Sequence, residues 1–584
     1  MASMRTAMTD DTTTTIPSLE DWQHWALVMA RANQMIMEAW ADNLAQGKSM
    51  PGFGLPVPHA TNDPMAWMTA GAEAWSKGME AWSQMLGHYS AAGEQKDRRF
   101  ASPEWRDNPI FDTVRQSYLA ISDKLLGTVE EIEGLDDAAR DRLRFATKGF
   151  VEAMSPANFM ATNPDVMKRT VETKGENLLA GLKNMLSDIT RGQVTQSPEG
   201  AFELGRNLAI TPGKVIYETK LFQLIQYAPA TEEVLETPLV IFPPWINRFY
   251  ILDLTPEKSF VKWTVDQGVT LFMVSWKSAD ESIRDIGMDD YVAAQEEAID
   301  VIRDLLGVEK VHTIGYCVAG TTMAATLAYL SGKGEAAKVA SATFFTAQID
   351  FEDPGDLKMF VGDDTLATLK QLTAETGVLD GRVMAATFNL LRGKDLIWNY
   401  VVNNYLMGND PTPFDLLHWN GDVTNLPGDW HRDYLERLYR QNLMMKPGGL
   451  QVKGVPIDLG SIETPAYIQA GREDHIAPAP SVWKLTRVLK GPKRFILAGS
   501  GHIAGVVNPP AANKYQYWTS DEPATTLQEF IAYSTEHKGS WWPDWIQWLN
   551  EQGPKKVKAK GARVPGEGKL KPIEDAPGRY VRTR

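Results

Sequence analysis

From about residue 200 onward, short apolar runs alternate with helical patterns, and this alternation constrains the fold more than any other feature of the chain. The run 237–245 enters a proline-rich turn, and 269–276 follows a helical stretch that ends at a glycine. Because a crossover helix returns the chain beside a parallel neighbour, the order predicts a parallel sheet with helices on both faces. The other predicted strands are 310–317, 338–350, 464–471 and 493–500, and the predicted helices are 259–268, 290–307 and 318–332.

Two segments depart from this rhythm. Residues 351–455 are helical with several turn signals, and an insertion of that length between core strands predicts a cap or lid. The stretch 554–584 holds ten Lys and Arg against three Asp and Glu, which predicts a solvated, partly extended basic tail. We therefore expect one catalytic domain over 201–584.

Residues 1–200 are expected to form a separate, mostly helical domain. Amphipathic patterns predict helices over 19–46, 63–86 and 111–131. The first 110 residues hold 11 of the 23 Met and 7 of the 19 Trp. Such residues either pack helices together or form an adaptable surface for an apolar partner.

Composition excludes several classes of protein. A net charge of −15 argues against a nucleic-acid binder. No apolar run is long enough to predict a transmembrane helix, and residues 1–20 lack the apolar segment of a secretory signal. One cysteine excludes an internal disulfide and a Cys-rich metal site, and it fits a reducing cytoplasm. Without a phosphate-binding loop or a metal-ligand cluster, no metal and no cofactor are expected.

The strongest local signal surrounds that single cysteine, Cys317. The segment 315–320, GYCVAG, lies where a predicted strand ends and a predicted helix begins, as in a nucleophile elbow. Small residues at Gly315 and Ala319 allow strand and helix to pack closely, although glycine is usual at the second place and here follows at Gly320. A helix N-terminus also favours a thiolate. The alternative is a buried structural cysteine.

An elbow needs a base and an orienting acid from later strands. His502 follows the last predicted core strand, where an α/β-hydrolase fold places its base. The preceding strand leads into GREDHIAP (471–478), where Asp474 is the candidate acid and Glu473 a weaker rival. His475 in that loop is the rival base. The agreement of Cys317, Asp474 and His502 favours catalysis over a structural cysteine.

Such a site also needs two backbone N–H groups to hold an oxyanion. Val318, directly after the nucleophile, supplies the first. The loop PPWINRFY (243–250) is expected to supply the second, through Ile246 or Asn247. In the same loop, Arg248 either meets an anionic substrate or is a surface arginine.

Longer blocks of the chain resemble the class I polyhydroxyalkanoate synthases. These blocks extend far beyond the elbow and cover most of the chain, while the first 110 residues match loosely. The blocks are SPANFMATNP (155–164), TPGKVIYE (211–218), FPPWINRFYILDL (242–254), GYCVAGT (315–321), FDLLHWNGDVTNLPG (414–428), GREDHIAP (471–478), SGHIAGVVNPP (500–510) and GSWWPDWIQWL (539–549).

The resemblance implies a function and roles for single residues. It implies polymerisation of short-chain (R)-3-hydroxyacyl-CoA into polyester with release of CoA. It also implies a cytoplasmic homodimer at polyester granules, whose Met- and Trp-rich N-terminal surface would bind the polymer or granule-associated proteins. Cys317 matches the nucleophile that carries the growing chain, His502 the base that activates its thiol, and Asp474 the aspartate associated with activation of the incoming 3-hydroxyl. Trp419 matches a tryptophan linked to dimer contacts or access.

Two other functions remain open from the residues. A Cys-dependent esterase or thioesterase would use the same three residues and differ mainly in water access. A non-catalytic scaffold of the same fold would require Asp474 or His502 to lie away from Cys317.

Overall fold

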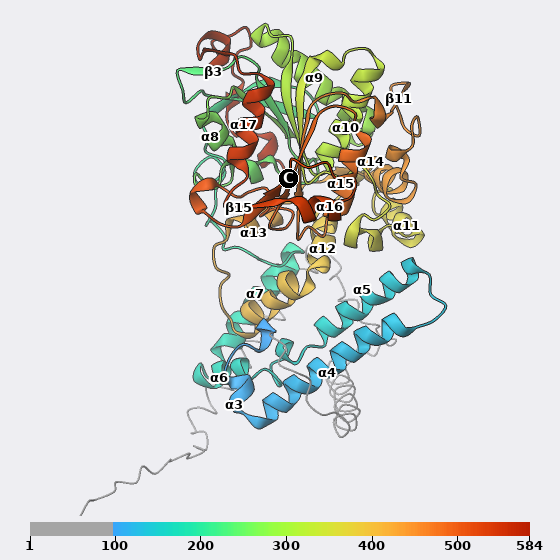
Figure 1. The fold of residues 1–584 in the computed structure, drawn as a ribbon. Helices are drawn as coiled ribbons and strands as arrows, with labels where there is room; N and C mark the ends of the chain where they lie inside the picture. The colour runs from blue at the N-terminus through green and yellow to red at the C-terminus, as the bar shows by residue number, and fades with distance from the viewer. Residues whose placement is uncertain (1–96) are drawn as a thin grey trace, which may run out of the picture. The chain divides into compact units, whose positions relative to one another are not determined.

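A computed structural model describes residues 97–584, so the helices predicted over 19–46 and 63–86 lie outside the described part of the chain. The chain divides into two compact units (Figure 1). One comprises the described part of residues 1–195 together with 392–411, and the other comprises 196–391 and 412–584.

The first unit is helical. Its longest helix, α4 (Pro109–Glu131), confirms the helix predicted over 111–131 and begins where the Asn108 side chain accepts a hydrogen bond from the N–H of Ile110. The other main helices are α3 (Glu104–Asp107), α5 (Asp137–Ala153), α6 (Pro164–Glu172) and α7 (Glu176–Arg191). Trp105 is fully buried against Phe100, with ring centroids 4.8 Å apart. This tryptophan therefore packs helices together and offers no surface to a partner.

Residues 392–411, expected to belong to the cap, instead belong to the first unit. They form two π-helical segments, η7 (Lys394–Trp398) and η8 (Val401–Leu406). The Asn177 amide of α7 donates to the carbonyl of Leu406 at 2.7 Å. A Cβ at Gly181 would lie 1.7 Å from the carbonyl oxygen of Tyr405, so α7 and η8 approach at a distance that only glycine permits.

The second unit is built on an eleven-stranded sheet in the order β15-β14-β13-β12-β7-β6-β4-β5-β2-β1-β17. Its six central strands are mutually parallel and confirm the predicted strands: β4 (Leu239–Phe242), β5 (Leu271–Trp276), β6 (Val311–Tyr316), β7 (Val339–Phe345), β12 (Ala466–Gly471) and β13 (Lys493–Ala498).

The sheet is mixed, whereas the alternation predicted a parallel one. Antiparallel strands flank the parallel centre on both sides and come from segments that carry no crossover helix. These strands are β1 (Gly213–Glu218), β2 (Phe222–Tyr227), β14 (Gln516–Thr519), β15 (Thr535–Lys538) and β17 (Glu574–Asp575).

Helices cover both faces, as predicted (Figure 1). One face packs against α9 (Met288–Leu306), α10 (Val318–Gly332) and α15 (Ala479–Val488), and the other against α8 (Phe260–Asp266) and α17 (Trp542–Gln552). Residues 318–330 of α10 are all buried, because sheet and neighbouring helices enclose this helix on every side. The apolar sequence after Cys317 therefore fixes the position of the cysteine.

The helical insertion between β7 and β12 is also present. Its elements in the second unit include α11 (Asp363–Leu372), α12 (Gly381–Leu391), α13 (Asp415–Gly421), α14 (Gly428–Asp433) and the π-helix η9 (Tyr434–Arg440).

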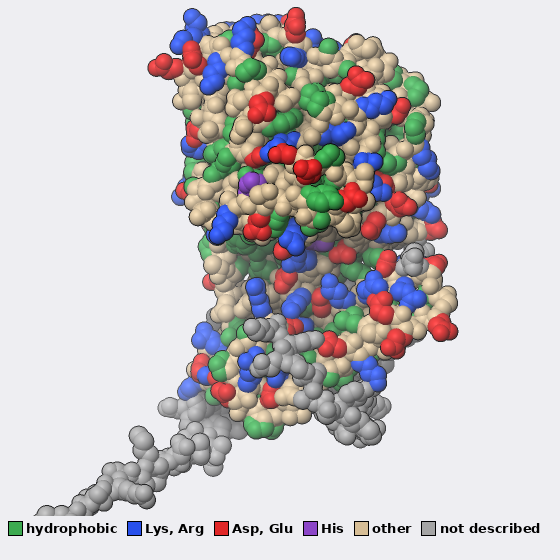
Figure 2. Space-filling view, in the orientation of Figure 1, with side chains coloured by type: hydrophobic (Ala, Val, Ile, Leu, Met, Phe, Trp, Pro, Cys, Tyr) green, Lys and Arg blue, Asp and Glu red, His purple; other side chains and the backbone are tan. Residues whose placement is uncertain are grey.

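The segment 554–584, predicted as a solvated, partly extended basic tail, is mostly exposed or half-buried, but two short strands pair it with other strands of the second unit. Within it, β16 (Lys556–Lys558) pairs with β3 (Glu233–Leu235), and β17 pairs with β1. Its lysines and arginines meet acidic residues elsewhere, as in the ion pairs Lys555–Glu236, Lys558–Glu233 and Arg579–Glu218. Long-range partners thus neutralise a charge excess that is visible only locally in the sequence. Figure 2 shows acidic and basic side chains interspersed on one face.

In the part of the chain that the structure describes, no helix is long and apolar enough to cross a membrane.

Candidate active site

Cys317 lies between β6 and α10 in a strained conformation. Its φ is +53° and its ψ is −128°, a region that residues with a side chain rarely adopt. Strand β6 and helix α10 approach each other closely at Gly315 and Gly320, because a Cβ on Gly315 would lie 2.6 Å from the Cα of Gly320. Gly320 therefore provides the close packing of strand and helix that was expected at Ala319. The result is the sharp strand-to-helix turn predicted for 315–320, with a partly buried thiol at the N-terminus of α10.

His502 and Asp474 meet at this turn. The His502 Nδ1 lies 2.7 Å from the Asp474 Oδ2, and the Asp474 side chain is fully buried. The Asp474 Oδ1 accepts two backbone N–H groups, from Ile476 and Ala477, each at 2.9 Å. These three contacts fix the carboxylate and with it the ring of His502, whose charge interacts with Cys317.

The electrostatics of His502 follow from this arrangement. Burial is the largest influence on the pKa of His502 and lowers it, but the negative charge of Asp474, its hydrogen bond to His502 and the interaction with Cys317 together outweigh burial and hold the pKa well above its usual value. The arrangement therefore favours the protonated form of His502. This charge arrangement favours a nucleophilic sulfur.

The rival residues lie differently. Glu473 is exposed, and the carboxylate that contacts His502 belongs to Asp474. His475 stays in the loop after β12, where its carbonyl accepts from the N–H of Asp356. The structure therefore brings together the three residues that the sequence analysis favoured.

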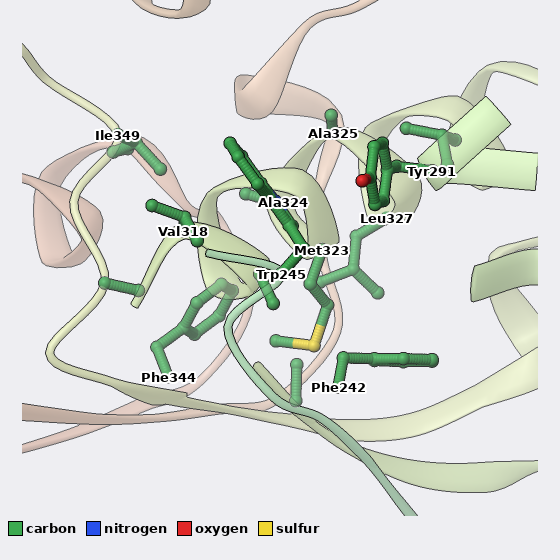
Figure 3. Packing of buried hydrophobic residues seen from close by; sticks show 14 of the residues in the cluster. Phe242, Trp245, Tyr291, Val318, Met323, Ala324, Ala325, Leu327, Phe344 and Ile349 are labelled. Carbon is green, nitrogen blue, oxygen red and sulfur yellow. The ribbon is translucent and has the colours of Figure 1, made fainter. Parts of the chain in front are cut away.

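The predicted oxyanion residues come from the turn itself and from the loop after the neighbouring strand β4. Val318 is the first residue of α10, so its N–H has no acceptor within the helix. The loop that carries Ile246 and Asn247 follows β4, which pairs directly with β6. Ile246 is buried, and Asn247 forms an isolated bridge with Val423 of the insertion. Figure 3 shows Trp245 of this loop in one cluster with Val318.

Arg248 is neither a surface residue nor open to solvent, since its side chain is 2% exposed. It pairs with Asp422 at 3.3 Å and donates to the carbonyls of Val423 at 3.0 Å, Tyr580 at 3.3 Å and Thr583 at 2.6 Å. Four of its five N–H groups are thus used inside the chain. We conclude that Arg248 ties the loop to the insertion and to the C-terminal segment.

Trp419 is also internal. Its side chain is buried, and its indole N–H donates to the Arg248 carbonyl at 2.8 Å. The tryptophan therefore supports the same loop from the insertion side.

The sequence analysis missed several residues beside the turn. Tyr316 donates to the His502 carbonyl at 3.2 Å and so joins the nucleophile strand to the histidine loop. From the insertion, Tyr434 packs against Trp245 with ring centroids 5.2 Å apart. Tyr434 and Tyr439 form a pair whose pKa values are raised by burial first, then by nearby charges that include Cys317. No local pattern marks these tyrosines, because the tertiary fold alone brings the insertion to the turn.

No group of three or more His, Cys, Asp or Glu side chains within residues 97–584 is arranged to hold a metal ion.

Together, a mixed sheet covered by helices, a strained turn after a central strand and a buried His–Asp pair define the α/β-hydrolase class of proteins, here with cysteine at the turn. Residues 240–509 match the family described as the alpha/beta hydrolase fold, and residues 96–264 match the N-terminus of poly-beta-hydroxybutyrate polymerase. A poly(3-hydroxyalkanoate) polymerase subunit of Cupriavidus necator is 46% identical over 86% of each chain. The corresponding subunit of Rhizobium meliloti is 41% identical over 97% of this chain and 96% of its own. The chain belongs to the poly(3-hydroxyalkanoate) polymerase family, and it is an acyltransferase.

Proposed function

We propose that the chain polymerises short-chain (R)-3-hydroxyacyl groups from CoA thioesters into polyester, through a covalent thioester on Cys317. The observation that carries this proposal is the buried His502–Asp474 pair beside a cysteine on a strained turn. The family membership supports polyester synthesis.

Acylation follows from the geometry. The Cys317 sulfur attacks the thioester carbonyl, and the oxyanion forms near the N–H of Val318 and a second N–H from Ile246 or Asn247. The C–S bond to CoA then breaks, and the CoA sulfur takes the proton from His502. The products are the acyl enzyme and free CoA. CoA enters as part of the substrate, so the reaction uses no cofactor.

Elongation needs a hydroxyl as the acceptor. His502 accepts the proton of the 3-hydroxyl while the hydroxyl oxygen attacks the thioester carbonyl. The ester bond forms, the carbonyl–sulfur bond breaks, and His502 returns the proton to the departing sulfur. Both oxygens of Asp474 are occupied, by His502 and by two backbone N–H groups. We therefore assign Asp474 the role of orienting His502 in both half-reactions.

A thioester suits this chemistry because it remains reactive toward an alcohol. Hydrolysis would compete if water reached the acyl enzyme, so the site must exclude water. Aromatic side chains of the insertion, among them Trp430 and Tyr434, are buried beside the loop that carries Trp245. This packing supports transfer to a hydroxyl over an esterase or thioesterase activity.

The first experiment is an incubation of purified protein with (R)-3-hydroxybutyryl-CoA, following CoA release and product mass together. We expect CoA release with a high-mass polyester. CoA release with free 3-hydroxybutyrate would identify a thioesterase instead. If no CoA is released and Cys317 reacts slowly with a thiol reagent, the results would favour the non-catalytic scaffold.

We also propose that the chain works as a homodimer in the cytoplasm, on the surface of polyester granules. The Met- and Trp-rich N-terminal sequence supports granule attachment. Deletion of residues 1–96 should impair attachment, and it spares Phe100 and Trp105, which belong to the core of the first unit. Retained attachment would count against the proposal. The homodimer is tested separately, by measuring the mass of the full chain by sedimentation.

A further inference from the structure

Gln348 is a buried amide with one unused acceptor beside the active site. It follows β7 in the loop that leads into the insertion, and its side chain is 5% exposed. Its Nε2 donates to the Tyr439 hydroxyl at 3.4 Å. Among the described residues, none donates a hydrogen bond to its Oε1.

The position of Gln348 relative to Cys317 follows from the sheet. Strand β7 pairs with β6, and the N–H of Cys317 donates to the carbonyl of Phe345 at 2.9 Å. One turn into α10, the Thr321 hydroxyl donates to the Gln348 carbonyl at 2.7 Å. The loops that carry Gln348 and Cys317 therefore leave the same edge of the sheet side by side.

The π-helix η9 explains how the insertion holds Gln348. In a π-helix the backbone bonds join residues five apart, so Tyr434 and Tyr439 lie one turn apart on one face. In an α-helix, five residues would separate the two side chains by about 140° around the axis. The π geometry brings the two rings to a centroid distance of 5.6 Å and lets the Tyr439 hydroxyl accept from the Gln348 Nε2.

The contacts of Gln348 leave one atom of its side-chain amide without a partner. The Thr321 hydroxyl donates to the Gln348 backbone carbonyl, and the Gln348 Nε2 donates to the Tyr439 hydroxyl. Among the described residues, Oε1 is therefore an unpaired acceptor in a buried place.

A buried acceptor without a donor is unfavourable, which makes it a strong recognition element for a ligand that brings a donor. The polar group that distinguishes a 3-hydroxyacyl chain from a plain acyl chain is a hydroxyl, which donates one hydrogen bond. We propose that the Gln348 Oε1 accepts this bond and selects hydroxyacyl over unsubstituted acyl substrates. The inference rests on the proposed function, because it concerns the acyl group delivered to Cys317.

The test uses full-length protein with Gln348→Met, which keeps the side-chain length and removes the acceptor. CoA release is measured in single turnovers with (R)-3-hydroxybutyryl-CoA and with butyryl-CoA, which can acylate Cys317 but lacks the hydroxyl. We expect the variant to acylate about tenfold more slowly with the hydroxyacyl substrate, the effect of one neutral hydrogen bond. The butyryl-CoA rate should not change.

Gln469→Met is the matched control. Gln469 is fully buried in neighbouring β12, and its amide atoms also lack partners among the described residues. It should preserve the ratio of the two rates. A preserved ratio in Gln348→Met would overturn the inference, while absence of CoA release from wild type would instead overturn the proposed function.

Tyr439→Phe provides a second variant should Gln348→Met fold poorly. It removes the hydroxyl that holds the amide, so the preference for the hydroxyacyl substrate should fall by a smaller factor. An unchanged preference in this variant would show that the amide does not depend on the Tyr439 hydroxyl, contrary to the proposal.

Discussion

Replacing Arg248 by methionine should destabilise the second unit strongly. The variant removes the charge that pairs with Asp422 in a place where both side chains are 3% exposed or less. It also leaves the carbonyls of Val423, Tyr580 and Thr583 without this donor. Losing one partner of a buried ion pair costs about 3–5 kcal/mol.

The surroundings of Asp422 place the effect within that range. Asp422 keeps an ion pair with Arg584 at 2.6 Å and accepts from the Tyr250 hydroxyl at 2.8 Å. These remaining partners offset part of the loss, so we expect about 3 kcal/mol, at the lower end. The matched control is Arg584→Met, since the Arg584 side chain is 59% exposed and its pair should contribute at most about 1 kcal/mol.

Urea unfolding followed by tryptophan fluorescence measures both variants, and steady-state CoA release measures activity. We expect Arg248→Met to shift the unfolding midpoint and to lower kcat, because the loop that carries Ile246 and Asn247 loses its anchor. A loss below about 1 kcal/mol together with a raised KM would refute this reasoning and indicate that Arg248 binds the anionic substrate.

Three further outcomes follow from the site and the core. Cys317→Ala should abolish CoA release, and His502→Ala should lose far more activity than His475→Ala; the reverse order of the two histidine variants would mean that the wrong base was chosen. Tyr316→Phe removes a single hydrogen bond to the His502 carbonyl, which contributes about 1 kcal/mol. We therefore expect kcat to fall about fivefold with little change in KM. An unchanged kcat would show that this bond does not position the base. Burial first, then the charge of a nearby lysine, lowers the pKa of His312 to about 3, so the unfolded chain binds a proton that the folded chain excludes, and stability should fall as pH drops from about 6.5 toward 3. His312→Phe should flatten this part of the stability curve, and an unchanged acid dependence would contradict the assignment.

The sequence was sufficient for the central part of the fold. Apolar runs of strand length between helical patterns predicted all six parallel strands, because a buried parallel strand is apolar on both faces and is recognised locally. The turn at Cys317 was predicted for the same reason, since close packing of strand and helix requires small residues within a few positions. The loops after β12 and β13 then left few candidates for the acid and base.

The flanking strands and the tail could not be predicted in this way. β17 is two residues long and pairs with β1, more than three hundred residues earlier. The lysines and arginines after residue 554 form a basic run in the sequence, and only the structure shows that three of them pair with acidic residues between 218 and 236. Strand and ion pairs between residues far apart in the chain produce no periodic pattern in the local sequence, so neither the flanking strands nor the C-terminal segment could be recognised.

For this protein, the sequence by itself determined which segments alternate between strand and helix, where the sharp turn falls, and which cysteine, histidine and aspartate are the candidates for the site. Those properties depend on side chains within about one helical turn or one strand. The tertiary structure alone decided that Arg248 is an internal anchor and that Tyr434 and Tyr439 share one face of a π-helix. It also decided that Gln348 keeps an unpaired oxygen beside Cys317, because such contacts depend on how distant segments pack.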